Sequence, residues 1–146
     1  MLARIKSLLS APPESQQDQQ QLQTAAAALL IEVMVVDGDL AETEQQMTKD
    51  LLQQLFGLES ELLTNLFEEA QREVDSATSL YQFTRQINEQ YTPDQKFDLL
   101  VAMWRVAYAD QHVDKYEEHI IRRIADLLHM RHSEFIQAKQ LAKPLA

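Results

Sequence analysis

The chain has 146 residues, 45% of them hydrophobic and 25% charged, which is typical of one soluble globular domain. It contains no cysteine, and this excludes disulfides and thiolate zinc sites. The formal net charge of −10 repels phosphate backbones and argues against nucleic-acid binding. No apolar run is long enough for a transmembrane segment and no secretory signal is visible, so we expect a cytoplasmic protein.

Residues 1–20 differ in composition from the rest of the chain. The first ten, MLARIKSLLS, place four apolar side chains at helical spacing among two basic ones, which predicts a short helix. Such a segment either docks on the domain or contacts a membrane surface. Two basic residues on one short helix bind lipid poorly, which favours docking or disorder. Pro12 and Pro13 then end this helix, and a glutamine-rich stretch leads into the main domain, residues 21–142.

Apolar residues recur at helical spacing throughout the main domain, and strict alternation is seen nowhere. Gly57 suits a helix C-terminus, Thr92 followed by Pro93 suits a helix start, and Ser60 and Ser133 are expected N-caps. The sequence therefore predicts an all-α, single-domain bundle of about seven helices. These helices are expected over residues 19–36, 41–56, 60–74 and 79–91, then from Pro93 through at least Ala107, over residues 114–128, and from Ser133.

The stretch VMVVDGDLAETEQ, residues 33–45, joins the first two of these helices. Gly38 suits a turn, but a turn does not require Asp37 and Asp39 beside it and Glu44 further on. A carboxylate at a helix C-terminus is unfavourable by a few tenths to about 1 kcal/mol, because the helix dipole is negative there. Asp37 therefore needs a compensating interaction.

The acidic turn recurs later in the chain. Asp110 follows Asp37 by 73 residues, and the same offset pairs Glu44 with Glu117. VMVVDGDLAETE is thus matched without a gap by VAYADQHVDKYE, and the Ser-Glu pair that opens the following helix recurs as well. Helical periodicity aligns apolar residues at many offsets but does not also align these polar ones. The sequence therefore indicates two duplicated helix–acidic turn–helix units.

Two interpretations of the acidic turns remain open on local chemistry. In the first, each Asp accepts amide hydrogen bonds at the start of the next helix, where the Glu is also favourable. In the second, the carboxylates and nearby carbonyls bind a hard cation such as Ca²⁺ or Mg²⁺. The spacing is not that of an EF-hand, since Gly38 is at the second position and Thr48 at the twelfth. On the spacing alone, capping is favoured over cation binding.

The doubled pattern D-G-x-apolar-x-x-x-E after an apolar helix resembles the tellurite-resistance TerB domain. It is similar also to the N-terminal domain of the membrane-anchored co-chaperone DjlA, although this chain has neither a transmembrane run nor a J-domain His-Pro-Asp. The resemblance covers roughly residues 21–141. It implies a compact helical bundle whose acidic residues form a divalent-cation site, and a role in stress responses such as tellurite resistance through complexes near the membrane.

The resemblance places Asp37, Gly38 and Glu44 in the first motif and Asp110 and Glu117 in the second. The second motif departs from the pattern, with glutamine and histidine where glycine and a variable residue are expected. The expected cation is Ca²⁺ or Mg²⁺, with Gly38 as the turn residue. The expected ligands are Asp37, Asp39, Glu44, Asp110 and Glu117.

Three functions are compatible with the sequence. One is a cation-binding protein-interaction module of a stress response, whose protein partner could be membrane-associated and which could form homo-oligomers. The second is a structural adaptor whose acidic turns are only caps. The third is a metal-dependent hydrolase, which is disfavoured because no catalytic motif or oxyanion donor set is visible. His129 and His132 either share a metal or, as we favour, line the link into the last helix.

Overall fold

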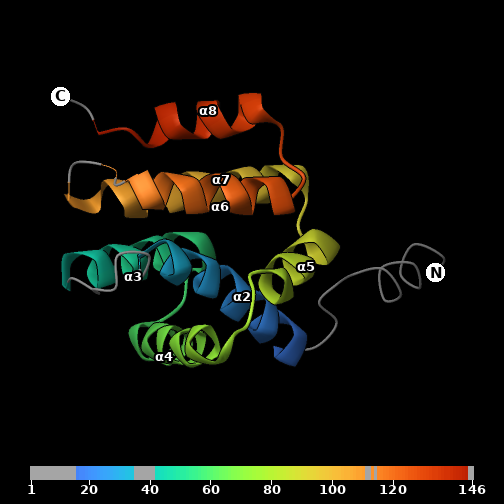
Figure 1. Ribbon diagram of the computed structural model, residues 1–146. Helices are drawn as coiled ribbons and strands as arrows, with labels where there is room; N and C mark the ends of the chain where they lie inside the picture. Colours follow the sequence, from blue (N-terminus) through green and yellow to red (C-terminus); the bar gives the residue numbers. More distant parts are fainter. Residues whose placement is uncertain (1–15, 35–41, 111–112, 114, 145–146) are drawn as a thin grey trace, which may run out of the picture.

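The computed structural model describes residues 16–34, 42–110, 113 and 115–144, and within them it is all-α (Figure 1). Seven α-helices and one 3₁₀ turn are present in these ranges, which confirms the predicted fold class. In chain order they are α2 (Gln16–Met34), α3 (Glu42–Phe56), α4 (Ser60–Ser76), α5 (Tyr81–Gln90), α6 (Pro93–Ala107), η2 (Tyr108–Asp110), α7 (Lys115–Leu127) and α8 (His132–Ala142).

Two apolar helices, α2 and α6, pack against each other at the centre of the bundle. The remaining helices surround this pair, with α4 against α2 and α8 against α6 on opposite sides of the molecule (Figure 1). The run from Ala25 to Ile31 is at most 1% exposed, and Met103 and Trp104 are fully buried. A helix that is apolar on most of its surface has to be covered on most sides, which explains why these two helices form the core.

The helix ends agree with the sequence in two places. Gly57 has a φ of +64°, a left-handed conformation that glycine adopts without strain, and it ends α3 as predicted. At the start of α6, the Gln95 N–H donates to the Thr92 hydroxyl at 3.2 Å and the Thr92 N–H donates to the Gln95 side-chain oxygen at 2.8 Å. This reciprocal pair is a capping box, and it confirms the predicted start.

Two predicted N-caps are wrong. Glu59, not Ser60, is the N-cap of α4, because its carbonyl already accepts a hydrogen bond from the Leu63 N–H at 2.8 Å. Arg131 is likewise the N-cap of α8, two residues before Ser133. There Glu134 supplies the capping contact, since its carboxylate accepts from the Arg131 N–H at 2.9 Å. Both serines therefore lie inside the first turns of their helices.

The C-terminus of α7 ties that helix to the two helices before it. His129 has a φ of 62°, and the Met130 N–H donates to the Ala125 carbonyl at 2.9 Å, closing the helix in a Schellman-type end. The carbonyls of the last turn, which have no amide partner further along the helix, also accept hydrogen bonds from two side chains of other helices. Asn88 of α5 donates to the Leu127 carbonyl at 2.9 Å, and Lys96 of α6 donates to the Leu128 carbonyl at 3.1 Å.

Several packing features support the predicted duplication, although superposition of the two halves stays a prediction. In sequence order α4 follows α3 as α8 follows α7. Helix α4 packs on α2, and α8 packs on α6, so each packs on the first helix of its own half. The ammonium of Lys49 lies 5.1 Å from the ring centre of Phe67 in α4. Arg122, 73 residues after Lys49, lies 4.8 Å from the ring centre of Phe135 in α8, although the two rings are 68 residues apart and do not follow the 73-residue offset.

Candidate functional site

The paired glutamates of the two acidic motifs are both buried. Glu44 lies in the first turn of α3 and is 8% exposed, and Glu117 lies in the first turn of α7 and is 5% exposed. They are the only buried carboxylates among the side chains whose burial the structure describes, a set that leaves out Asp110. A carboxylate rarely leaves water unless it is hydrogen-bonded, paired or bound to a metal, and neither residue lacks an interacting partner.

The position of each glutamate offsets part of the cost of its burial. The first turn of a helix presents amide N–H groups and the positive end of the helix dipole, which favour a carboxylate. Thr48, one turn further along α3, is fully buried, and its hydroxyl donates to the Glu44 carbonyl at 2.9 Å. The backbone of this first turn is therefore held by a buried hydrogen bond, and Glu44 is part of a fixed structure rather than of a solvated surface.

The two motifs lie in elements that pack across the bundle. Helix α3, which contains Glu44, packs against η2, the turn that ends at Asp110. Helix α2, which precedes the first acidic turn, packs against α7, which contains Glu117. Each half therefore places one motif element against an element of the other half. This arrangement supports a shared or paired acidic pocket.

The other predicted ligands are placed only in part. Asp37, Gly38 and Asp39 lie outside the described residues, and for Asp110 only the backbone, at the end of η2, is described. In the ranges the structure describes, no group of three or more His, Asp or Glu side chains is arranged to hold a metal ion. The metal site is therefore still a prediction.

The histidine pair is found at the junction between α7 and α8. His129 and His132 are both exposed, and the ring of His132 stacks on Phe135 at a centroid distance of 5.8 Å. His129 forms the left-handed end of α7. Both residues therefore have a structural role in this link, as the sequence favoured.

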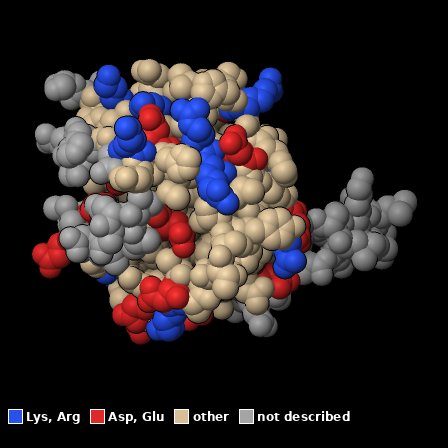
Figure 2. Space-filling view, viewed as in Figure 1, with Lys and Arg blue, Asp and Glu red and all other residues tan. Residues whose placement is uncertain are grey.

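A surface groove was not anticipated from the sequence. It lies between α2, α4 and α5 and has a volume of about 1380 Å³. Figure 2 shows carboxylates gathered at the lower end of the molecule, where Figure 1 places α4, whereas lysine and arginine lie mainly in the upper part. The helical spacing of Leu62, Leu63 and Leu66 predicts an apolar face for α4, but only the structure shows that Leu62 remains 49% exposed in this groove.

No helix among the described residues has the length and hydropathy needed to cross a bilayer. Within the described residues the fold is an all-α bundle, and the two acidic sequence motifs fall between α2 and α3 and between α6 and α7. The family model of the tellurite resistance protein TerB matches residues 23–140, and the chain belongs to this family. The match confirms the resemblance seen in the doubled motif. Searches of curated proteins and of solved structures each found no match.

Proposed function

We propose that this protein is a non-catalytic TerB-like module that binds a divalent cation through its two acidic motifs and acts through a protein partner. The observation that supports it most directly is the burial of Glu44 and Glu117 at equivalent positions of the two halves. Burial of one such carboxylate is explained by a local cap. The two motifs lie on elements that pack across the bundle, which is compatible with one ligand shared by both.

The donor chemistry fits a hard cation. Carboxylate and carbonyl oxygens are the ligands that Ca²⁺ and Mg²⁺ prefer. The residues that would hold the ion are Glu44 and Glu117, together with Asp37, Asp39 and Asp110 of the adjoining turns. When bound, the ion would neutralise carboxylates that otherwise repel one another, and it would fix the two turns relative to each other.

Family membership supports a proposal for the cellular role. We place the protein in a cytoplasmic response to tellurite, metal or envelope stress, in which the cation-bound form presents a surface to a partner protein. A second candidate function is the structural adaptor, and the first-turn positions of both glutamates favour it, because caps alone would explain them.

Unfolding with and without a cation separates these functions. We expect excess Ca²⁺ or Mg²⁺ to stabilise the wild-type chain by about 2.7 kcal/mol when the free ion is at 100 times its Kd. The double variant Asp37→Asn with Asp110→Asn should lose this gain, and so should Glu44→Gln with Glu117→Gln. Thermal unfolding monitored by circular dichroism gives the measurement.

The matched control replaces exposed aspartates on the same helices, Asp50 of α3 and Asp126 of α7, by asparagine. This control removes the same charge and should keep the full response to the ion. If wild type and the site variants respond equally, or none of them responds, the acidic turns are caps and the cation-binding function is wrong. Hydrolysis assays with and without metal test the remaining alternative.

A further inference from the structure

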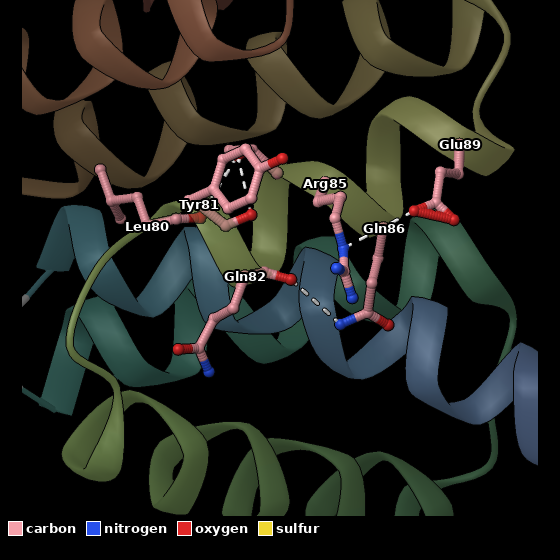
Figure 3. Close-up of polar contacts among 7 residues, drawn as sticks. Leu80, Tyr81, Gln82, Arg85, Gln86 and Glu89 are labelled. Atoms are coloured by element: carbon pink, nitrogen blue, oxygen red, sulfur yellow. Dashed lines mark hydrogen bonds and ion pairs between the residues drawn. The ribbon is translucent and has the colours of Figure 1, made fainter.

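The groove between α2, α4 and α5 has an apolar part that the described residues leave partly open. It is formed by Leu22, Phe56, Leu58 and Leu66 together with the half-exposed Leu62. In Figure 3 the side chains of Arg85 and Gln86 extend from α5 toward α2 and border this space. Along α4 the groove extends from Leu62 to Glu73, about 16 Å at the helical rise of 1.5 Å per residue.

The rim of the groove is acidic. Five carboxylates and two guanidinium groups line it, and both guanidinium groups are already paired with glutamates of the rim. Arg72 contacts Glu69 at 2.6 Å, and Arg85 contacts Glu89 at 3.6 Å. Burial and the nearby Glu69 carboxylate raise the pKa of Glu73, as expected for a rim with an excess of negative charge. The groove therefore suits a segment with an apolar stripe and basic flanks.

Residues 1–10 of this chain have that pattern. On a helix, with 100° between successive residues, Leu2, Ile5, Leu8 and Leu9 share one face. Arg4 and Lys6 then flank that face, one along each edge, and the segment contains no acidic residue. A ten-residue helix is about 15 Å long, which is close to the length of the groove along α4.

The covalent connection brings this segment close to the groove. Only residues 11–15 separate it from Gln16, the start of α2, and the groove is lined by α2 from Asp18 to Thr24. Five residues reach at most about 17 Å. A short tether gives an effective concentration in the millimolar range, so even a weak intrinsic affinity is enough for docking.

We propose that residues 1–10 dock as a basic amphipathic helix in the acidic groove formed by α2, α4 and α5 of the same chain. The apolar face would cover Leu62 and its neighbours, and Arg4 and Lys6 would face the carboxylates of the rim. The groove would thus be a binding site for a basic amphipathic helix. Such docking does not depend on cation binding by the acidic motifs.

Paramagnetic relaxation on the full chain tests the proposal. Because the sequence has no cysteine, Ser7→Cys gives a single attachment point for a nitroxide label, on the side of the helix away from its apolar face. We expect the label to broaden the amide signals of the groove, such as those of Leu62, Leu66 and Gln86, to near loss. Signals of α8 on the opposite side of the bundle should keep their intensity.

Charge reversal on α4 supplies the matched comparison. Glu68→Lys with Glu73→Lys alters the rim, whereas Glu61→Lys with Asp75→Lys makes the same charge change outside the groove lining. The first pair should restore the groove signals, and the second should leave them broadened. If the first pair does not fold, Leu62→Asp replaces it with the same expected restoration.

Three results would overturn the proposal. One is full intensity at the groove in the labelled wild-type chain. Another is broadening of unlabelled ¹⁵N chains mixed with spin-labelled ¹⁴N chains, because the occupant would then be a second copy. The third is full intensity of the groove signals in solution together with binding of the labelled segment to phosphatidylcholine–phosphatidylserine vesicles. This result would assign residues 1–10 to a membrane surface.

Discussion

The carboxylates of this acidic chain have very different surroundings. Glu61 and Asp75 of α4 are exposed, whereas Glu44 and Glu117 are buried and Glu32 of α2 is partly buried. Burial raises the pKa of Glu32, because its charged form loses hydration without a compensating charge. A raised pKa means that the folded chain holds this proton more tightly than the unfolded chain does. Stability therefore falls as pH rises from the ordinary glutamate value through the folded value.

Glu32→Gln should remove this penalty. Above the folded pKa the wild-type chain retains an ionised, partly buried carboxylate, so the variant should unfold at a higher temperature than wild type at pH 7. Below the ordinary glutamate pKa both chains are neutral at this position, and the difference should become small. Thermal unfolding at pH 7 and pH 3.5 gives the comparison. Glu68→Gln, at an exposed position on α4, is the control. An equal gain in unfolding temperature for Glu32→Gln at both pH values would contradict the explanation.

At the scale of the elements, helix starts are set by which backbone carbonyl first accepts a helical hydrogen bond. Thr92 meets this condition and also forms the capping box of α6. Ser60 and Ser133 do not, because Glu59 and Arg131 occupy the cap positions one and two residues earlier. A serine and a glutamate near a helix start therefore indicate that a helix begins, but not the residue at which it begins.

Thr92→Ala should lower the free energy of unfolding by about 1 kcal/mol, because the Gln95 N–H loses its acceptor. Ser133→Ala should change it by less than about 0.5 kcal/mol, since this serine is exposed and is not the N-cap. Urea unfolding of the two variants beside wild type measures both values. Equal losses would mean that Ser133 caps α8 after all.

At the scale of the whole molecule, α5 joins the two halves into one folding unit. It packs against α2 of the first half and α7 of the second, and its Asn88 caps the end of α7. Ile87 is fully buried in this position. The two halves therefore share one continuous core rather than two separate ones, which predicts a single cooperative unfolding transition.

Ile87→Ala should lower the free energy of unfolding by about 2 to 5 kcal/mol through lost burial and a cavity. Unfolding should remain one transition with an unchanged denaturant slope. Tyr81→Ala on the same helix, where the side chain is 61% exposed, should change stability by less than about 0.5 kcal/mol. Two resolved transitions in the Ile87 variant would show instead that the halves fold independently.

The fold class, the approximate helices and the family could be predicted from the sequence alone, because helical periodicity and the doubled acidic motif are local patterns that need no partner. Helical spacing also places Trp104 and Met103 on an apolar helix face, which predicts core positions, and both are fully buried. The three-dimensional packing was needed to establish that Glu44 and Glu117 are buried, that α3 packs against the turn ending at Asp110, and that α2, α4 and α5 enclose a groove. Burial and grooves depend on contacts between residues far apart in the chain, and no local pattern encodes which helix covers which face.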